Sequence, residues 1–578
     1  MLKLMKHLRG SMIFAIIAPL FMLLEVFMDL MQPTLLKNII DVGVANGDIQ
    51  YILNTGLQMI GFALLGVIGG AGCTVFSSIA SMNFGTSLRD DMYRHIQTLS
   101  FAEIDRFKTS SLVTRMTNDV TQVQNTVMML LRVAVRSPLL CIGGIIMALI
   151  VSPRLSMILI VAVPVLAVAV VLIVRRAFPL FGQMQVKIDR VNTVMRENLL
   201  GVRVVKAFDA GEQEQKRFGV ANDDLMAFSI KAQRIIMTLW PVVMLIMNFS
   251  IVAVLWFGGA SAIAGEVSTG DMMSFMNYIL QVLNSIMMSI MLIIGFSRAR
   301  ASAERINEVL DTHSSIVDPA VPRTPERFDV QFDHVSFKFD PSDPDCVLND
   351  LSFAASPGQT VGIIGGTGSG KSSLISLIPR LYDVSDGAVR IGGVDVRDIP
   401  LEDLRRHIGI VMQESTLFSG TVEENIRWGG EDASPEQFES ALRDAEAYGF
   451  VHELPDGADG YVEQRGQNFS GGQKQRLSIA RTLIKDPRIL ILDDSTSAVD
   501  MATEARIQAA LKRRGGDDTV VFIIAQRISA ISDASKILVL DDGRIVAQGT
   551  HAELLQTCEI YRSIAVSQLG EEALLHVR

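Results

Sequence analysis

Six stretches of about 20 mostly apolar residues crowd the first half of this chain, and no such stretch follows Gly295. A bilayer core about 30 Å thick is crossed by roughly 20 apolar residues in a helix. The predicted spans are 11–36, 56–80, 133–152, 155–176, 238–263 and 272–296. Because a chain of 578 residues is too long for one core, we expect a soluble domain to follow the membrane domain.

The first apolar run resembles a secretory signal only superficially. It follows Lys3, Lys6 and Arg9, but it is too long for the apolar core of a signal and contains Glu25 and Asp29. We therefore expect it to stay in the protein as a membrane span.

Lys and Arg residues predict which side of the membrane each connection faces, because they concentrate in cytoplasmic loops. The connection after the second span holds Arg89, Arg94, Arg106, Lys108, Arg115, Arg132 and Arg136. The connection after the fourth span is equally rich, from Arg175 to Arg234, whereas the opposite loops hold only Lys37 and Arg154. We expect an integral protein of the cell (inner) membrane with both termini in the cytoplasm.

The two long cytoplasmic connections keep the apolar spacing of helices over 81–131 and 177–237. Twenty further helical residues would carry each helix about 30 Å beyond the membrane. Short connecting helices are expected around Phe101–Phe107 and Arg203–Gly211. They are either simple turns of extended helix pairs or contacts that carry the motion of the soluble domain to the membrane, and we favour the second interpretation.

Composition excludes some functions. The net charge is −10 and no long basic block is present, so nucleic-acid binding is not expected. The four cysteines, Cys73, Cys141, Cys346 and Cys558, lack metal-ligand spacing and are interpreted as ordinary thiols.

The second half of the chain has the pattern of an α/β domain. A Pro-, Asp- and Thr-rich linker at 312–327 separates the membrane domain, 1–311, from a domain at 328–578. Strand-like runs such as Val330–Phe332 and Thr360–Ile364 alternate there with helical ones, which indicates a parallel sheet.

A phosphate-binding loop follows the strand Val361–Ile364 and leads into a helix at Ser373. Its residues are Gly365, Gly366, Thr367, Gly368, Ser369, Gly370, Lys371 and Ser372. The glycines let backbone N–H groups surround phosphates at a helix N-terminus. Lys371 is expected to reach the β and γ phosphates and Ser372 to offer its hydroxyl to Mg²⁺.

Two later segments complete the nucleotide chemistry. The buried strand Ile489–Leu492 ends in Asp493, which can hold the Mg²⁺ shell from the other side. The segment Asn468–Gln473 begins a helix without a preceding strand, and its exposed amides suit an anion. Because the first loop already holds this chain's phosphates, we infer that the second segment meets the nucleotide of another subunit.

These motifs resemble the ABC transporter family, specifically exporters with fused membrane and nucleotide domains, over essentially the whole chain. The resemblance implies a multi-domain fold, in which an all-α six-helix transmembrane domain of type 1 exporter architecture precedes an α/β P-loop ATPase domain. It also implies that ATP and Mg²⁺ bind between two such domains. Each nucleotide would lie between the phosphate loop of one chain and the signature segment of the other.

The resemblance assigns roles to individual positions. Phe339 matches the adenine-stacking aromatic, Gln413 the Gln loop, Ser497–Asp500 the D-loop and Ala525–Arg527 the switch loop. The implied ATP contacts are Phe339, the phosphate loop from Gly365 to Ser372, and Ser373. The implied Mg²⁺ ligands are Ser372, Gln413 and Asp493, and the residues implied to meet the partner's ATP are Ser470, Gly471, Gly472, Gln473 and Asp500.

Two positions at the γ-phosphate depart from the family pattern. Asp494 stands where a glutamate usually polarises the attacking water, and its carboxylate is withdrawn by one methylene. Gln526 stands where a histidine is usual and cannot take up a proton. A smaller departure is Gln464, where exporters usually carry glutamate.

The paired changes favour a degenerate subunit of a heterodimer over neutral drift in a homodimer with slow ATPase. This chain's own site would bind ATP but hydrolyse it poorly, and its intact signature would complete the productive site of a second half-transporter. Bacterial heterodimeric multidrug exporters resemble it in this Asp-and-Gln combination.

The cargo is expected to be small and hydrophobic or amphipathic. Of the 28 methionines, all except Met412 and Met501 lie in the membrane half. Their flexible side chains suit an adaptable cavity for varied apolar guests, or they simply fill membrane helices. Glu25 and Asp29 lie on one helix face and either attract cationic amphiphiles or serve a structural or gating role, which we favour. Asn277, Gln281 and Asn284 are candidates to line the pore or to bond between helices.

Other functions of the same architecture stay open. A lipid or lipopeptide flippase and an exporter-fold siderophore importer share its organisation. A channel or sensor that only binds ATP is a further alternative, which a partner with intact catalytic residues would disfavour.

Overall fold

The computed structural model describes residues 1–569 and divides the chain into two compact units. The first unit comprises residues 1–97 and 110–311, and the second comprises residues 98–109 together with the chain from Thr312 onward. The segment Thr98–Thr109 lies between two predicted spans in the sequence, yet it belongs to the second unit. Residues 312–327, predicted as a linker, contain neither helix nor strand.

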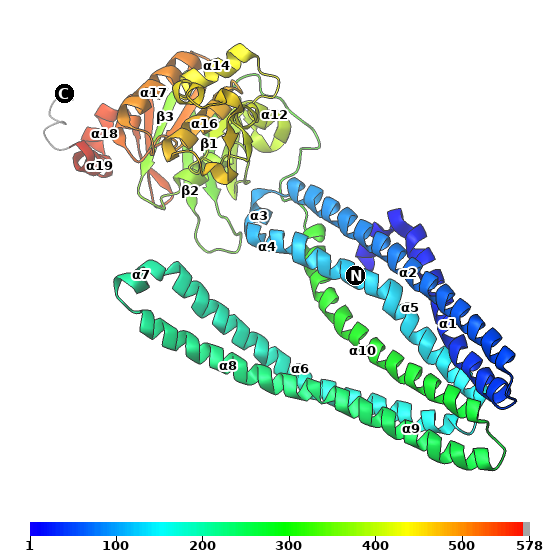
Figure 1. Ribbon diagram of the computed structural model, residues 1–578. Coiled ribbons are helices and arrows are strands. Elements are labelled where there is room, and N and C mark those ends of the chain that lie inside the picture. Colours follow the sequence, from blue (N-terminus) through cyan, green and yellow to red (C-terminus); the bar gives the residue numbers. More distant parts are fainter. Residues whose placement is uncertain (570–578) are drawn as a thin grey trace. The chain divides into compact units, whose positions relative to one another are not determined.

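The described residues of the first unit form helices joined by short turns (Figure 1). Its long helices are α1 (Met12–Asn38), α2 (Ile49–Thr98), α5 (Val120–Val151), α6 (Ser156–Leu200), α8 (Gly211–Met237), α9 (Leu239–Ile263) and α10 (Thr269–Asp311). Its shorter pieces are the 3-10 helix Leu2–Ser11, the π-helices Ile39–Val44 and Arg115–Asp119, α4 (Thr109–Thr114) and α7 (Val202–Ala207).

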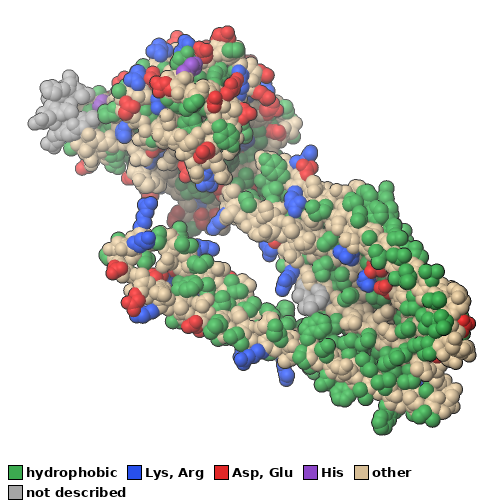
Figure 2. All heavy atoms as spheres, viewed as in Figure 1, with side chains coloured by type: hydrophobic (Ala, Val, Ile, Leu, Met, Phe, Trp, Pro, Cys, Tyr) green, Lys and Arg blue, Asp and Glu red, His purple; other side chains and the backbone are tan. Residues whose placement is uncertain are grey.

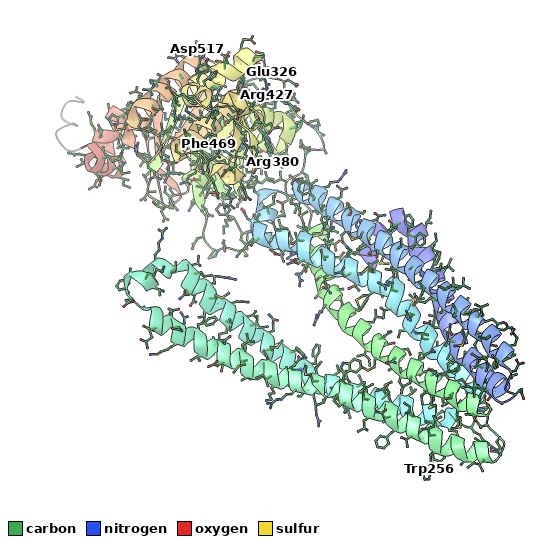
Figure 3. All side chains as sticks on the ribbon, viewed as in Figure 1. Trp256, Glu326, Arg380, Arg427, Phe469 and Asp517 are labelled. Carbon is green, nitrogen blue, oxygen red and sulfur yellow. The ribbon has the colours of Figure 1, made fainter. Side chains whose placement is uncertain are left out.

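The outer surface of the helical unit carries exposed apolar side chains over the predicted spans. Ile13, Trp256 and Ile263 are 71%, 75% and 93% exposed, which suits a surface bathed in lipid rather than water. Figure 2 shows hydrophobic side chains spread over this unit, and Figure 3 shows Trp256 projecting from α9. Within the part of the chain that the structure describes, five helical segments are long and apolar enough to cross a membrane. The sixth predicted span falls in α10 and stays a prediction.

The helices continue far beyond the predicted spans, as the spacing of the long connections indicated. The second predicted span ends at 80, whereas α2 runs to Thr98, and the fourth ends at 176, whereas α6 runs to Leu200. The first connecting helix lies where it was expected, as α3 (Phe101–Phe107), whereas α7 begins and ends earlier than the predicted Arg203–Gly211 because α8 already starts at Gly211.

Hydrogen bonds join the helices inside the first unit. Ser137 on α5 donates to the Ser285 carbonyl oxygen on α10 at 2.6 Å. The fully buried Tyr278 on α10 donates to the Leu30 carbonyl oxygen on α1 at 2.7 Å. Such bonds satisfy polar groups that would otherwise lie unpaired in an apolar surrounding.

The second unit contains a mixed sheet with the strand order β12-β11-β3-β10-β9-β6 and an antiparallel sheet with the order β2-β1-β4-β5. The strands of the first sheet are β3 (Thr360–Gly365), β6 (Ile408–Val411), β9 (Ile489–Asp493), β10 (Val520–Ile524), β11 (Lys536–Asp541) and β12 (Arg544–Gly549). The second sheet comprises β1 (Val330–Phe337), β2 (Leu348–Ala355), β4 (Asp386–Ile391) and β5 (Val394–Asp395), and β7 (Gly420–Thr421) pairs with β8 (Tyr461–Val462).

Parallel pairing in the larger sheet brings the important strand ends together. Strand β10 lies between β3 and β9, with Ile524 paired to Ile363 on one side and to Asp493 on the other. The carboxyl ends of these strands therefore meet at one edge, where ligands bind in sheets of this kind. The phosphate loop after β3, Asp493 at the end of β9 and the switch loop after β10 all lie at this edge.

Helices cover the sheets of the second unit. They are α11 (Lys371–Leu377), α12 (Leu401–Arg406), α13 (Val422–Arg427), α14 (Pro435–Asp444), α15 (Tyr448–His452), α16 (Gly471–Leu483), α17 (Met501–Gly515), α18 (His551–Thr557) and α19 (Glu559–Leu569). One hydrophobic core includes Phe332, Phe353 and Phe522, and another packs α16 against Leu490 and Leu492 of β9.

Candidate functional site

The phosphate loop turns sharply between β3 and α11. Gly370 has φ +94°, a left-handed conformation that side chains rarely adopt, and a Cβ there would lie 2.6 Å from the Leu348 side chain. Gly365 is equally confined, because a Cβ would lie 2.1 Å from the Leu540 carbonyl oxygen. These two glycines are therefore required for the close turn. The helix begins at Lys371 rather than at the predicted Ser373.

Lys371 lies along its own loop. Its Nζ donates to the carbonyl oxygens of Gly365 at 2.9 Å and Gly366 at 2.7 Å. Burial lowers the pKa of Lys371, while the charges of Asp493 and Asp494 act in the opposite direction. The ammonium group is thus held over the loop, where it can meet phosphate oxygens.

Ser372 and Asp493 form a small set of hard oxygen ligands. The Ser372 hydroxyl donates to Asp493 Oδ1 at 3.3 Å, so the two lie within reach of one cation. Hydroxyl and carboxylate oxygens are ligands that Mg²⁺ accepts alongside phosphate and water. Among the described residues, no cluster of three or more His, Cys, Asp or Glu is placed to hold a metal ion. Gln413 is exposed, two residues beyond β6.

The two substituted γ-phosphate positions contact each other. Gln526 donates from Nε2 to Asp494 Oδ2 at 2.8 Å. Asp494 directly follows the strand β9 in a left-handed conformation, with φ +47°, and its backbone N–H donates to the Ile524 carbonyl oxygen at 3.0 Å. The short carboxylate is therefore held by an amide that cannot accept its proton.

Both carboxylates at the end of β9 are shifted toward the neutral form. Burial raises the pKa of Asp493 and of Asp494 above the usual value. Hydrogen bonds from Ser372 and Gln526 act in the opposite direction, as does the charge of Lys371. A bound cation would favour the ionised forms that binding requires.

Phe339, the residue assigned to stack on adenine, contacts a second aromatic side chain. Phe339 is 51% exposed and lies edge-on to Tyr382, with ring centroids 5.3 Å apart. The Tyr382 hydroxyl donates to Asp105 Oδ2 on α3 at 2.5 Å, and its ring lies 6.2 Å from that of Phe101. The adenine candidate is thus linked to the helix α3 through one tyrosine.

The signature segment is exposed and rigidly capped. Ser470 caps α16, because its Oγ accepts from Gln473 N–H at 3.3 Å while Gln473 Oε1 accepts from Ser470 N–H at 2.9 Å. Gly471 is exposed, and a Cβ on Gly472 would lie 2.9 Å from the Ala498 carbonyl oxygen. The capping box uses the N–H groups of Ser470 and Gln473, and the exposed Gly471 is the part of this turn that a second molecule can reach.

The D-loop is tied to the signature helix. Buried Gln475 donates to Ser497 Oγ at 3.2 Å and accepts from Ala498 N–H at 3.0 Å. Asp500 caps α17 by accepting from Thr503 N–H at 3.0 Å. The structure thus gives Asp500 a local capping role beside its predicted role toward the partner's ATP.

The acidic pair in the first predicted span has a basic partner. Arg136 on α5 contacts Glu25 through Nη1 and donates from Nη2 to Asp29 Oδ2 at 3.0 Å. The charge pattern grouped Arg136 with the cytoplasmic connection, but its guanidinium lies beside the middle of the first predicted span. Because unpaired charges are costly at such a depth, this triad favours the structural interpretation of the two carboxylates.

The three amides on α10 do not share one environment. Gln281 donates to the Asp29 carbonyl oxygen at 3.3 Å, which places it beside the charged triad. Asn277 bonds within its own helix, to the Met273 carbonyl oxygen at 3.0 Å, and is exposed like Asn284. Gln281 is therefore an interhelical contact, whereas Asn277 and Asn284 remain pore-lining candidates.

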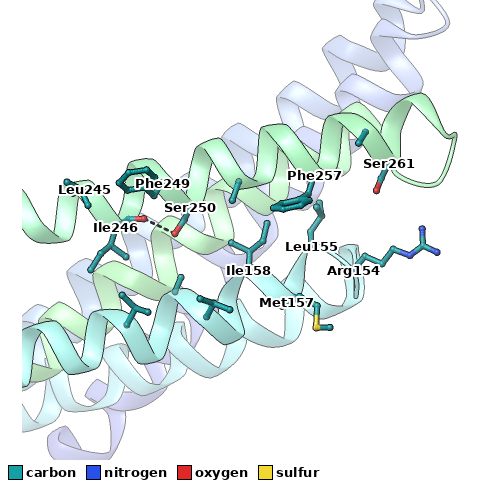
Figure 4. A pocket seen from close by; sticks show the side chains of 15 residues that line it. Arg154, Leu155, Met157, Ile158, Leu245, Ile246, Phe249, Ser250, Phe257 and Ser261 are labelled. Carbon is teal, nitrogen blue, oxygen red and sulfur yellow. Dashed lines mark hydrogen bonds between the residues drawn. The ribbon is translucent and has the colours of Figure 1, made fainter.

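An open cavity of about 880 Å³ lies between α6 and α9, with the lining side chains of Phe249 and Phe257 67% and 61% exposed (Figure 4). Its walls are almost entirely apolar and include Ile158, Phe249 and Phe257. Arg154 and Ser261 lie at one end, near the turn between α5 and α6 and the end of α9. No sequence pattern indicates this cavity, because its walls come from two helices that are separate in the chain.

Tyr382, Gln475 and Arg136 were not singled out from the sequence. Tyr382 and Gln475 lie in segments without a motif of their own, and only their contacts across the fold indicate a role. Arg136 carried a usable signal, because it falls inside the predicted span 133–152, where a charge is unusual.

Comparisons with known proteins agree over the full length. The model of the ABC transporter transmembrane region matches residues 15–287, and the ABC transporter model matches residues 348–497. An uncharacterised ABC transporter ATP-binding protein of Bacillus subtilis (strain 168) is 40% identical over 572 residues, which cover 99% of each chain.

Two further similarities bear on function. A fatty acid ABC transporter ATP-binding/permease protein of Mycobacterium tuberculosis (strain CDC 1551 / Oshkosh) is 35% identical over 82% of this chain and 75% of its own. The solved structure of a bacterial Atm1-family ABC exporter with ATP bound superimposes with a TM-score of 0.78 at 27% identity, covering 98% of this chain and 99% of that one.

Proposed function

Because this chain belongs to the ABC transporter family and has its membrane and ATP-binding domains in an exporter fold, we propose that it is one subunit of a heterodimeric exporter with two unequal ATP sites. Its own phosphate loop would bind Mg²⁺ and ATP, and its signature segment would complete the partner's site. The partner is a second half-transporter that retains the catalytic glutamate and the switch histidine.

The observation that carries this proposal is the 2.8 Å hydrogen bond from Gln526 to Asp494. A general base must be placed within a fraction of an ångström of the attacking water, and the aspartate is one methylene shorter than the usual glutamate. Its neighbour supplies an amide that can neither accept a proton nor become positive. Loss of general-base assistance lowers a rate by about 10²–10⁴-fold.

The motifs that match the family pattern support the proposal of two unequal ATP sites. Lys371, Ser372 and Asp493 are arranged to hold ATP with Mg²⁺, so binding is expected even where hydrolysis is slow. Ser470 and Gly471 are exposed and Ser470 is paired with Gln473 in a capping box, as suits a segment that serves another subunit. Mg²⁺ would supply charge stabilisation to the phosphates, and these residues would hold and orient them.

The cargo we propose is a small hydrophobic or amphipathic molecule, such as a drug or a lipid-like compound. The apolar cavity between α6 and α9 has room for such a guest. The relative named as a fatty acid transporter supports the lipid-like alternative. The protein would sit in the cell (inner) membrane with both termini in the cytoplasm, as the distribution of Lys and Arg favours.

ATP turnover of the purified chain, alone and with its partner, tests the proposal. Bound ATP is measured in the same samples, so that an inactive preparation is recognised. We expect the chain alone to bind ATP and to hydrolyse it at no more than a few per cent of the assembled transporter's rate. Brisk turnover by two copies of this chain would overturn the unequal-site proposal.

A further inference from the structure

A side chain of α19 (Glu559–Leu569) forms hydrogen bonds with the backbone of the switch loop. Gln568 donates from Nε2 to the Gln526 carbonyl oxygen at 2.7 Å. The Oε1 atom of the same side chain accepts from the Ile528 N–H at 2.8 Å. One amide group therefore bridges the two backbone groups that flank Arg527.

Only an amide of this length suits both contacts. A glutamine side chain offers one acceptor and two donors, which match a backbone carbonyl and a backbone N–H. A glutamate at position 568 could still accept from Ile528 but could not donate to Gln526. An alanine could do neither.

The helix that carries Gln568 is itself firmly anchored. Tyr561 on α19 is fully buried, and its hydroxyl lies 2.6 Å from His551 Nδ1 on α18. Tyr561 and Ala565 belong to the same hydrophobic cluster as Ala525 and Ile528, the buried neighbours of the switch residue. The amide of Gln568 and the loop it holds are thus fixed to one core.

The rest of the switch loop is held more weakly. Gln526 and Arg527 are exposed, and the Arg527 guanidinium lies 3.7 Å from Glu504 on α17. Glu504 is buried, but Arg527 is about half exposed and the separation is long, so this pair is a weak restraint. Backbone hydrogen bonds from Ala530 and Ile531 hold the carbonyl oxygens of Arg527 and Ile528, whereas Gln568 holds the Gln526 carbonyl oxygen and the Ile528 N–H.

We propose that Gln568 is a positioning residue of the ATP site, which acts through Gln526. By fixing the backbone on both sides of Arg527, it keeps the Gln526 side chain within 2.8 Å of Asp494. Its two hydrogen bonds go to the backbone of Gln526 and Ile528 rather than to Asp494. Its effect on nucleotide rests on the proposed function, in which Gln526 faces the γ-phosphate, whereas its hold on the loop does not.

Hydrogen–deuterium exchange of the full-length protein tests the hold directly. Gln568→Ala should speed exchange in the peptide that covers residues 526–531 by about 5–10-fold, the effect of losing two hydrogen bonds. Gln568→Glu should speed it as well, because the donor to Gln526 is lost. Gln556→Ala, an exposed glutamine on α18, is the matched control and should leave it unchanged. Unchanged exchange in Gln568→Ala would overturn the proposal.

Release of a fluorescent ATP analogue then tests whether the hold matters at the site. Gln526→Ala and Gln568→Ala should each speed release by about 3–10-fold, and the double variant should be no faster than Gln526→Ala alone. Additive effects would show that Gln568 does not act through Gln526 and would overturn its positioning role. If Gln526→Ala leaves release unchanged while the exchange result holds, the assignment of Gln526 in the proposed function fails and the hold on the loop stands.

Discussion

The Tyr382 hydroxyl donates a 2.5 Å hydrogen bond to Asp105, while the Tyr382 ring lies edge-on to Phe339. Tyr382 therefore contacts both Phe339, the side chain assigned to adenine, and the helix α3. Burial, together with the Asp105 carboxylate, raises the pKa of Tyr382 well above its usual value. The phenol consequently stays a neutral donor throughout the physiological pH range.

Tyr382→Phe should leave nucleotide binding intact but weaken the coupling between the ATP site and the helix α3. The phenylalanine ring can keep its contact with Phe339, so ATP affinity should change by less than about twofold. The bond to Asp105 is lost, so stimulation of ATPase by transported compounds should fall by about 3–10-fold, the net effect of one typical hydrogen bond. Stimulated and basal ATPase of the assembled transporter measure the difference. Tyr461→Phe, at an exposed ring, serves as control and should leave both rates unchanged.

Restoring the usual residues should restore hydrolysis at this chain's own site. Asp494→Glu with Gln526→His should raise its turnover by about 10²-fold, because the carboxylate then reaches the water and a histidine replaces the amide. Asp494→Glu alone should give a smaller gain. The assay uses an assembled transporter whose partner lacks its catalytic glutamate, so that only this site contributes. A double variant as slow as the parent would contradict the explanation given for the weak site.

Stability should depend on pH through the raised pKa values of Asp493 and Asp494. A carboxyl group whose pKa is raised on folding contributes stability that is present below its unfolded pKa, about 3.9, and is lost as the pH rises through the folded value. Asp494→Asn removes one of these groups without removing the Mg²⁺ ligand. It should therefore raise the Tm of the nucleotide-free protein at pH 7 by about 2–4 °C and leave it unchanged near pH 4.

The control for this prediction is Asp517→Asn, since Asp517 is exposed. Thermal unfolding of the full chain in detergent, scanned at several pH values, provides the measurement. A stabilisation by Asp494→Asn that is equal at pH 4 and pH 7 would show that charge is not its cause.

The sequence predicted local features of the fold well, because each depends on a short pattern. The apolar runs located α1 and α9 to within about two residues, and the strand ending at Asp493 was correctly placed. The phosphate loop and the capped helix start at Ser470 likewise follow from neighbouring residues. The predicted ends of α7 were less accurate, because the residues on both sides also have a helical pattern. The helix spans Val202–Ala207 instead of the predicted Arg203–Gly211.

Contacts between distant segments could not be predicted in the same way. Gln568 and Gln526 are 42 residues apart, and Tyr382 and Asp105 are 277 apart. No periodicity or motif joins such positions, because their proximity depends on how strands and helices pack. The interaction between Asp494 and Gln526 lies between these cases: the motifs placed both at the γ-phosphate, but the hydrogen bond itself required the fold.

Arg136 provides the strongest test of the membrane half. Arg136→Gln leaves Glu25 and Asp29 without their counter-charge in an apolar surrounding, which should cost about 2–4 kcal/mol of stability. The charge-free triple variant, Glu25→Gln with Asp29→Asn and Arg136→Gln, should recover most of this loss because no unpaired charge remains. Arg154→Gln, which breaks an exposed pair with Glu266, should cost less than about 1 kcal/mol. Thermal unfolding in detergent ranks the variants, and transport of a cationic dye by the triple variant decides the role of the two carboxylates. Unimpaired transport supports the structural role argued from the Arg136 pairing, whereas selective loss of cationic dyes would show that Glu25 and Asp29 bind substrate.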